Sequence, residues 1–330
     1  MNMEIVFLGT SAAVPTRQRN LSSFVLLYNG EQILFDAGED VQRQFEEARL
    51  KFNAPLSIFI SHMHGDHIIG LPGLLFHFTL VSRTQEVKIW GPPGIFPYLY
   101  LHRMIVGLRA PFLKEVYEIH SEKKKLLLYD YQGNPDQKPV EISYKDDKIH
   151  ETANYVINAV PMCHSVPTTG FKFLEKPRSG KFEPKIAEHI GIPQGHLWKK
   201  MQMGEIIEYK GQTYNPEELE IVGPKRPGVV ISYSADTKMC DALYSLAKGS
   251  NVFICEATYG NELKDLADEK KHMTAIQCAQ VAQESNVIQL ILTHISSRYV
   301  EVDSLLKEAQ SIFPNSLVAY DLMRFPLLND

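Results

Sequence analysis

Three histidines and one aspartate fall within six consecutive residues, in the stretch S-H-M-H-G-D-H that begins at Ser61. In an extended chain alternate side chains point the same way, so His62 and His64 can converge on one ion. Asp66 and His67 then turn towards a second ion. Imidazole nitrogen and carboxylate oxygen suit zinc or a similar divalent ion, and a catalytic site also needs ligands from elsewhere and a coordination position for water. The run therefore predicts half of a two-metal hydrolytic site rather than a polar surface turn.

Three residues elsewhere in the chain qualify as the missing ligands. His164, Asp236 and His294 each follow a short apolar run with strand character. Their recurrence allows four separate segments to converge at one sheet edge, where a carboxylate such as Asp236 can bridge two ions. Any one of these histidines alone would more often be a surface or core residue.

The elements that must position these residues are also visible in the sequence. Leu56 to Ser61 is an apolar run typical of a strand, and Leu71 to Val81 repeats apolar residues at helical spacing. The histidine-rich run is therefore expected on a loop after a strand, at the carboxyl edge where layered α/β proteins usually bind ligands.

Further short apolar runs predict two β-rich halves with helices between them. The other expected strands are Glu4 to Leu8, Ser23 to Leu27, Gln32 to Phe35, Val87 to Trp90, Tyr155 to Val160, Val229 to Tyr233, Val252 to Cys255, Leu290 to Thr293 and Ser316 to Ala319, and the other expected helices are Lys238 to Ala247, Thr274 to Glu284 and Val302 to Ile312.

The composition is typical of a soluble globular protein, with 44% hydrophobic and 22% charged residues among 330. No run approaches the ~20 apolar residues of a membrane span, and the first residues do not resemble a signal peptide. We therefore expect a cytoplasmic protein without membrane contact. The four cysteines lack C-x-x-C spacing, which argues against a disulfide framework. A net charge of -5 gives no global signal for nucleic acid, so a polyanion would need a local basic surface.

The segment from Lys172 to Arg226 differs from both halves. It is rich in proline and mixed charges and shows little sustained periodicity. By its charge pattern alone a solvated loop is favoured, because glutamates in its second part cancel the basic first part. We interpret the segment as an insertion or arm.

With these residues in place, the chain resembles the metallo-β-lactamase-fold proteins and, among them, the tRNA 3′-processing endonucleases of the tRNase Z family. The resemblance runs nearly end to end and implies an α/β fold, an αββα sandwich made by a single domain over residues 1–330 with an inserted, flexible tRNA-binding arm at residues 171–226. The motifs that carry it are Phe35 to Glu39, Ser61 to His67, His164, Ser234 to Thr237 and Thr293 to Tyr299.

The resemblance also implies how metal is held. Asp236 would bridge two divalent ions per subunit, expected to be zinc, and Asp36 would hold ligands by hydrogen bonds from behind. Such ions lower the pKa of water from ~15.7 towards ~7 and clamp a phosphate oxygen. One ion would take His62, His64 and His164, and the other would take Asp66, His67 and His294.

Two motifs supply the expected proton-transfer groups. Glu256-Ala257-Thr258 resembles the family's H-E-A-T motif with Cys255 in place of His, and His272 opens an H-x-T element. By the resemblance, Glu256 positions His272 to protonate the departing ribose oxygen, and Asp66 orients or deprotonates the attacking water.

Residues that contact the substrate are expected in two places. Pro15 to Asn20 resembles a P-x-K-x-R-N loop that in relatives governs the cleavage position, with Arg17 in place of Lys, whose planar fork is a different donor. The arm would grip the tRNA elbow, although His196 replaces a proline of the family pattern, and Trp198 would offer stacking. The expected substrate contacts are Arg17, Arg19, Asn20, Lys172, Lys176, Arg178, Lys181, Lys185, Lys199, Lys200 and Arg298.

The resemblance thus implies a zinc-dependent endoribonuclease that removes the 3′ trailer from precursor tRNA near the discriminator nucleotide and leaves a 3′-hydroxyl. It also implies a homodimer in which one subunit's arm serves the other's active site. Two alternatives stay open, a general dinuclear-metal phosphodiesterase acting on small substrates and a metal-bound RNA-binding module without turnover. The retained Glu256 and His272 argue against the module. A β-CASP nuclease is disfavoured, because no large insertion separates Asp236 from His294.

Overall fold

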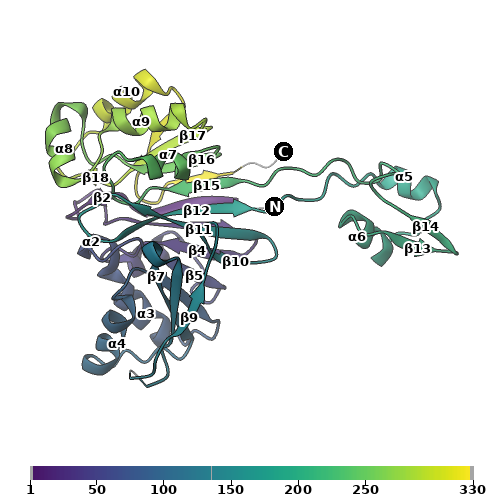
Figure 1. Ribbon diagram of the computed structural model, residues 1–330, viewed down its shortest axis with the longest axis horizontal. Coiled ribbons are helices and arrows are strands. Elements are labelled where there is room, and N and C mark those ends of the chain that lie inside the picture. The colour runs from purple at the N-terminus through teal and green to yellow at the C-terminus, as the bar shows by residue number, and fades with distance from the viewer. Residues whose placement is uncertain (1–2, 135, 328–330) are drawn as a thin grey trace. The chain divides into compact units, whose positions relative to one another are not determined.

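Two β-sheets form the centre of the computed structural model, which describes residues 3–134 and 136–327 (Figure 1). The nine-stranded sheet has the order β20 (Arg324–Pro326), β1 (Met3–Gly9), β3 (Ser23–Tyr28), β4 (Glu31–Phe35), β5 (Leu56–Phe59), β6 (Val87–Gly91), β7 (Leu113–His120), β8 (Lys125–Asp130) and β9 (Val140–Ser143). The seven-stranded sheet has the order β10 (Lys148–Glu151), β11 (Tyr155–Met162), β12 (Thr168–Glu175), β15 (Val230–Tyr233), β16 (Val252–Glu256), β17 (Gln289–Thr293) and β19 (Ser316–Val318).

Aromatic side chains fill the space between the sheets. Phe35 of β4 contacts Phe171 of β12 with ring centroids 5.8 Å apart, and Phe24 of β3 meets Tyr233 of β15 edge-on at 5.0 Å. These strands bury side chains on both faces, which explains their nearly continuous apolar sequences.

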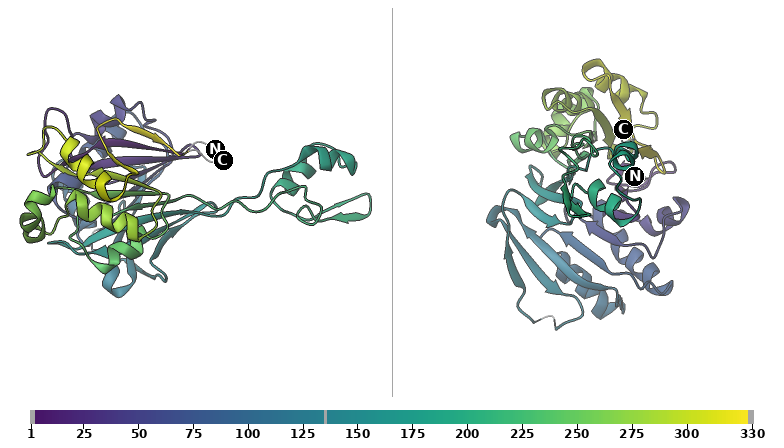
Figure 2. Two further views of the ribbon diagram at one scale, coloured as in Figure 1. Left: turned by 90° about the horizontal axis from the view of Figure 1, so that it is seen from above. Right: turned by 90° about the vertical axis from the view of Figure 1, so that its right-hand side faces the viewer.

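Helices cover the outer face of each sheet (Figures 1 and 2). They use one apolar side each, so Phe45 and Leu74 join the core of the nine-stranded sheet while Leu246 and Ala279 join that of the seven-stranded sheet. The resulting four layers confirm the α/β sandwich expected from the sequence. The first group contains α1 (Val41–Glu47), α3 (Gly70–Leu80) and α4 (Ile95–Ile105), and the second contains α7 (Asp241–Ala247), α9 (Ala275–Glu284) and α10 (Asp303–Ile312), with α8 (Lys264–Lys270) preceding α9.

Most expected elements are found within a few residues of their expected ends. The expected strand from Leu56 ends at Phe59, and the helix expected from Lys238 begins only at Asp241. Lys238 does not join that helix because its backbone N–H donates to the carbonyl of Cys163, which ties the loop after β15 to the loop after β11. Within the described residues, no helix is both long and apolar enough to cross a membrane.

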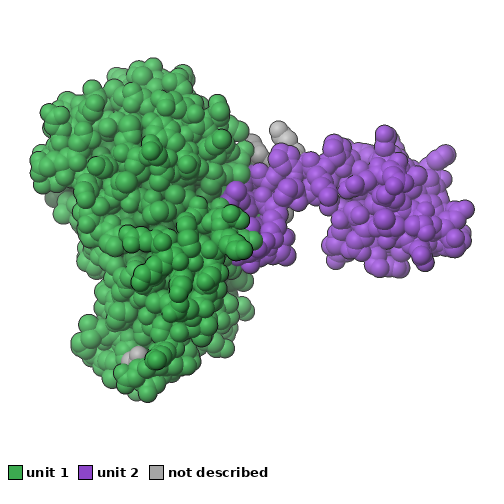
Figure 3. Space-filling model, in the orientation of Figure 1, with its two compact units in different colours: residues 1–150, 157–173, 230–330 green, residues 151–156, 174–229 purple. Residues whose placement is uncertain are grey.

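The chain divides into two compact units, coloured separately in Figure 3. Unit 2 comprises residues 151–156 and 174–229 and has its own small core around Ala187, Ile192 and Met201. It is therefore not the irregular loop that its charge pattern favours. Its elements are α5 (Pro184–His189), α6 (His196–Gln202), β13 (Ile207–Tyr209) and β14 (Gln212–Tyr214).

Candidate metal centre

The carboxyl ends of strands from both sheets deliver the histidine and aspartate side chains. β5 runs parallel to β4, and β15, β16 and β17 are parallel to one another, so their carboxyl ends lie at common edges. Asp66 and His67 lie on the single-turn α2 (Gly65–Ile68). All seven sequence-predicted ligands fall into two groups that share Asp236, each with ligand atoms within 4.8 Å of one another.

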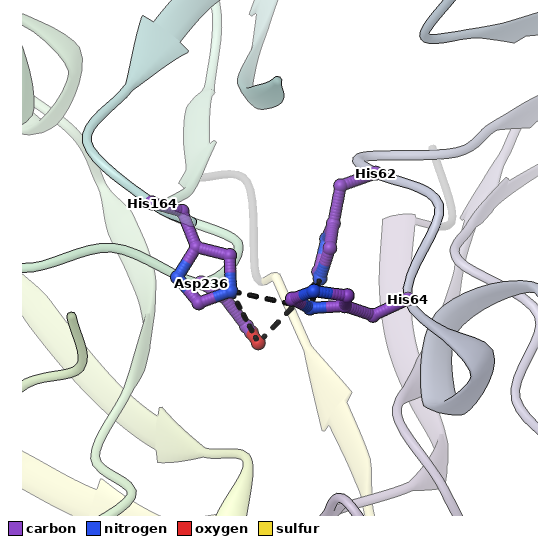
Figure 4. Close-up of side chains that lie close together, drawn as sticks. All are labelled: His62, His64, His164 and Asp236. Atoms are coloured by element: carbon purple, nitrogen blue, oxygen red, sulfur yellow. Dashed lines mark hydrogen bonds and ion pairs between the residues drawn. The ribbon is translucent and has the colours of Figure 1, made fainter. Parts of the chain in front are cut away.

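The first group consists of His62, His64, His164 and Asp236 (Figure 4). His64 Nδ1 lies 3.1 Å from His62 Nε2 and 3.2 Å from His164 Nε2. Asp236 Oδ2 lies 3.6 Å from His62 Nε2. Two nitrogens each ~2.0–2.1 Å from a tetrahedral ion are ~3.3–3.4 Å apart. The spacing of these nitrogens therefore fits ligation of one such ion.

The second group consists of Asp66, His67, His294 and the same Asp236. His67 Nε2 and His294 Nε2 are 3.3 Å apart, and Asp236 Oδ1 lies 3.4 Å from each. That oxygen is buried and has no hydrogen-bond partner among the described residues. A buried carboxylate oxygen without a hydrogen-bond donor is costly unless a positive charge compensates it, and Asp236 directs one such oxygen to each group.

Four of the imidazoles are oriented by hydrogen bonds on the side of the ring away from the cluster. Three of them are His62, His164 and His294. His62 Nδ1 lies 2.9 Å from Ser61 Oγ, and His164 Nδ1 donates to the carbonyl of Lys271 over 3.1 Å. His294 Nδ1 lies 2.9 Å from Thr258 Oγ1. In each case the other ring nitrogen faces the cluster, which is the tautomer that a metal needs.

Asp36 performs this task for His67, in the supporting position expected of it. Its Oδ2 lies 2.8 Å from His67 Nδ1 and accepts from Tyr233 Oη over 2.7 Å. Ser61 adds two further hydrogen bonds, from its backbone N–H to Oδ1 and from its hydroxyl to Oδ2. Asp36 is fully buried and adopts a left-handed backbone with φ of 56°, a conformation that aspartate tolerates better than most residues.

The charge states suit cation binding. Burial lowers the pKa of His62, and the charge of His67 lowers it further, so the ring is neutral and able to coordinate. Burial acts to raise the pKa of Asp66, but the hydrogen bond with His294 and the charge of His67 outweigh it and keep the carboxylate ionised. His67 differs: burial opposes its charge, yet Asp236 and Asp36 raise its pKa, and a cation would replace that proton.

A buried acid and a histidine lie next to the second group. His272 Nδ1 lies 2.8 Å from Glu256 Oε1, as the motif comparison predicts. Burial acts to lower the pKa of His272, but the charge and hydrogen bond of Glu256 outweigh it and raise the pKa to about 9. Glu256 is also held by the backbone N–H of Thr237 at 3.0 Å and by the hydroxyl of Thr258 at 2.7 Å. His272 is therefore a cationic acid at neutral pH, in a fixed orientation.

The replacement of His by Cys255 leaves this pair intact. Successive side chains of β16 point to opposite faces, so Cys255 packs in the core beneath α9 while Glu256 faces the site. Cys278 of α9 donates its thiol to the carbonyl of Glu256 over 2.8 Å. Cys255 is thus a core residue.

The expected substrate loop is only partly exposed. Arg19 Nη1 donates to Thr10 Oγ1 and to the carbonyl of Ala319, each over 2.7 Å, and Asn20 Nδ2 donates to the carbonyl of Glu39. These bonds hold the loop itself. Arg17 is exposed beside a cavity of about 250 Å³ that is also lined by Tyr299 and Val300.

The expected arm residues are divided between the two units. Lys172 lies on β12 in unit 1, half-buried, with its ammonium group donating to the carbonyl of Lys248. Arg298 is exposed in unit 1, while Trp198 of unit 2 donates to the carbonyl of Ile192 and packs on Phe182 rather than lying free for stacking. In unit 2, Lys176 pairs with Glu151, Arg178 with Glu175 and Lys181 with Glu183, whereas Lys185, Lys199 and Lys200 are exposed.

Apart from Asp36, sequence reasoning missed the residues that support the ligands. Ser61, Tyr233, Thr258 and Lys271 adjoin or lie within the recognised motifs, but a hydroxyl or a backbone carbonyl carries no sequence signal for its partner. Thr258 is the exception. It follows Glu256 by two residues at the end of a strand, where alternate side chains point the same way, so its position near the site could have been inferred.

Comparisons with known proteins agree with this geometry. Residues 3–114 match the family model of the anti-Pycsar protein Apyc1. The chain is 36% identical over 322 residues to ribonuclease Z of Methanosarcina mazei, and the match covers 97% of each protein. Among solved structures, the short form of human tRNase Z matches with a TM-score of 0.66 and 24% identity over 98% of each chain. The metallo-β-lactamase fold protein YhfI from Bacillus subtilis matches with a TM-score of 0.64 and 15% identity over 99% of each chain. The fold is therefore the metallo-β-lactamase fold.

Proposed function

This chain belongs to the ribonuclease Z family, and from that premise we propose that it is a zinc-dependent endoribonuclease that removes the 3′ trailer from precursor tRNA. Cleavage near the discriminator nucleotide would leave a 3′-hydroxyl on the tRNA. The observation that carries the proposal is the union of two metal-ligand groups, joined by Asp236, with the ion pair of Glu256 and His272 beside them. A metal-ligand cluster alone is compatible with many kinds of hydrolase. The additional proton donor, His272, suits a reaction in which a poor alkoxide leaving group must be protonated.

Two divalent ions fit the residues present. His62, His64 and His164 would hold one, Asp66, His67 and His294 would hold the other, and the orphaned Oδ1 of Asp236 supports a cation between the groups. Nitrogen-rich, partly carboxylate ligation suits zinc. When bound, such ions supply an activated water at neutral pH and neutralise charge on the phosphate.

The chain's own residues account for the remaining steps. Asp66 is held by the backbone N–H of Ala13 over 2.8 Å, and its ionised carboxylate orients the attacking water. His272 donates a proton to the ribose oxygen as the phosphodiester bond breaks, and Glu256 keeps that proton on the ring until then. Thr258 couples the two functions because its hydroxyl contacts both Glu256 and His294.

We assign tRNA binding to unit 2 and to the exposed Arg17 and Arg298. Exposed lysines at 185, 199 and 200 support contacts of unit 2 with the phosphate backbone. We also propose a homodimer in which the arm of one subunit serves the active site of the other.

The deciding experiment is cleavage of a 3′-extended precursor tRNA by the purified, zinc-loaded protein, with the cut mapped to the nucleotide. We expect cleavage next to the discriminator base and its loss in His64→Ala and Asp236→Ala, together with lost zinc. Lys307→Ala, exposed on the outer helix α10, is the control and should behave as wild type. A wild-type protein that carries zinc and leaves the precursor intact would rule out the proposal.

A further inference from the structure

A cavity of about 440 Å³ in unit 1 borders the His164 side of the metal centre. His164 itself lines the cavity, as does Ser165, whose Oγ lies 3.4 Å from His64 Nε2. The volume lies within the range of small-molecule sites. A group that fills this cavity therefore lies directly beside a substrate held at the metal centre.

One part of the cavity lining, called the floor, is apolar and consists of prolines and a methionine. Pro92 and Pro93 follow β6, and Met162 ends β11 beside them. Pro92 and Met162 are buried, whereas Pro93 is exposed. Proline rings and a thioether make favourable contacts with the face of an aromatic ring. The floor thus suits a planar ligand.

The rest of the lining, called the rim, is polar without carrying net charge. His120 lines it at the end of β7, with its Nε2 buried 3.6 Å from Oε2 of Glu118 and the rest of the side chain partly exposed, and Ser121 and Ser165 add hydroxyl groups. Glu122 and Lys123 lie next to His120, so their charges offset each other. A neutral ring with hydrogen-bonding edges fits this rim better than a phosphate does.

The two sides of the metal centre are lined differently. On the side of Asp66, the segment leading to Arg17 is attached through Ala13, and the second small cavity lies against Arg17 and Tyr299. The larger cavity lies against the opposite group, where His164 lines it and Ser165 connects it to His64. An RNA strand crossing the metal centre would therefore place its two flanking nucleotides in different surroundings.

We propose that the cavity between Pro93, Met162 and His120 binds the base of one nucleotide flanking the cleaved bond, the one on the side away from Arg17. This inference rests on the proposed ribonuclease activity. Ser121 and Ser165 supply hydroxyl groups to the edge of the base, the imidazole of His120 closes one side of the cavity, and the prolines and Met162 cover the face of the base. The site would act in substrate positioning, because a base held here fixes the phosphodiester relative to the metal centre.

The test compares three precursor tRNAs in single-turnover cleavage: the intact precursor, one with an abasic nucleotide just 5′ of the cut and one with it just 3′. We expect wild type to cleave one of the two abasic precursors about 5- to 100-fold more slowly than the intact one, the range for loss of one base-stacking contact. In His120→Ala and in Pro93→Gly that ratio should fall towards one. Lys307→Ala, on α10 and outside the cavity, should keep the wild-type ratio, and zinc content and melting temperature report whether each variant is intact.

The outcomes separate the two proposals. If wild type cleaves both abasic precursors as fast as the intact one, or if both cavity variants keep the wild-type ratio, the base-binding site is refuted while the ribonuclease activity stands. If wild type cleaves no precursor at all, the proposed function fails and the base-binding site fails with it.

Discussion

At the scale of single residues, the site depends on pairs in which one side chain sets the state of another. Glu256 keeps His272 protonated, and Thr258 links Glu256 to the ligand His294. Neither Glu256 nor Thr258 is expected to touch the substrate. Their effects should therefore appear in the pH dependence of catalysis and in metal affinity.

The first prediction concerns the alkaline limb of the pH profile. His272 is cationic below its pKa of about 9, so its acid form is present at neutral pH and is lost as the pH rises through that value. We expect log kcat/KM for precursor cleavage to decrease with rising pH. The midpoint of this decrease should lie at about pH 9 or lower, because bound cations lower the pKa of His272. Glu256→Gln removes the charge that raises the pKa, so the limb should move to lower pH.

The same profile measured for His272→Ala provides the control. Cleavage should slow by about 10²- to 10⁴-fold, the usual contribution of a general acid, and the alkaline limb should disappear while zinc content is unchanged. Full activity in this variant, or an unmoved limb in Glu256→Gln, would contradict the assigned roles.

The second prediction concerns the support of His294. Thr258→Val keeps the shape of the side chain but removes the hydroxyl that contacts His294 Nδ1. We expect zinc affinity to fall by about 10- to 100-fold, which is typical when the partner of a metal-ligating histidine is lost. Competition with a zinc chelator measures it. Thr79→Val, on α3 away from the site, is the control, and equal affinity in both variants would count against the link.

At the scale of elements, the metal centre requires the loop after β4 to pack tightly on the start of α3. The backbone N–H of Gly70 donates to the carbonyl of Ala37 over 3.0 Å, and a Cβ at Gly70 would lie 1.9 Å from the carbonyl oxygen of Gly38. Neither partner is a flexible side chain, so the clash cannot be relieved cheaply. This close approach sets the positions of Asp36 on one side and His67 on the other.

The third prediction compares two glycines of the same helix. Gly70→Ala should destabilise the protein by about 1–3 kcal/mol, as overpacking does. Gly73→Ala meets only the side chain of Gln42, at 3.3 Å, and gains helix propensity, so it should be neutral or stabilising by up to about 1 kcal/mol. Thermal or urea unfolding of the two variants measures the difference. Equal stability would show that the backbone contact is not a constraint.

At the scale of the whole molecule, unit 1 contains both large cores and every candidate metal ligand. Among the described residues, none from 174–229 belongs to the two apolar cores between the sheets and their covering helices. Unit 2 has a separate core. Each unit is therefore expected to retain its structure when the other is altered.

The fourth prediction removes most of unit 2, including its core. Arg178 and Arg226 form an antiparallel bridge with N···O distances of 3.0 and 2.9 Å, so residues 179–225 can be replaced by Gly-Ser-Gly without moving the ends. The shortened protein should still bind zinc and hydrolyse bis(p-nitrophenyl) phosphate, whereas precursor tRNA cleavage should fall by at least roughly tenfold through lost phosphate contacts. If the shortened protein cleaves the precursor as fast as wild type, unit 2 does not take part in substrate binding.

The fifth prediction concerns the dimer. Leu101, Met104 and Ile105 lie at i, i+3 and i+4 spacing on one face of α4, and each is a large apolar side chain with more than half of its surface exposed, as is Leu80 at the end of α3. An exposed apolar helix face suits contact with a second copy of the chain. Leu101→Glu combined with Ile105→Glu should shift the mass measured by light scattering from dimer to monomer. Ile288→Glu, at an exposed apolar position elsewhere in unit 1, should leave the mass unchanged. A wild-type protein that is monomeric would contradict the proposal.

The sequence by itself determined the site's donors and most of the strands that carry them. Dense ligand spacing near Ser61 and the recurrence of His164, Asp236 and His294 after apolar runs are local patterns, and local patterns report chemistry and periodicity directly. The sequence did not predict α4, β7, β8 or β12. Buried and accessible residues follow no regular period in β7 and β8, and β12 is almost continuously buried although it contains Lys172 and Glu175.

Only the tertiary structure decided the distances between the donor atoms and which group holds each imidazole. That Asp236 presents one oxygen to each group, that Asp36 holds His67, and that Thr258 joins His294 to Glu256 are relations between residues far apart in the chain. Their distances depend on how the two sheets stack. A hydrogen bond across such distances leaves no periodic trace in a single sequence, because either partner alone is an ordinary polar residue.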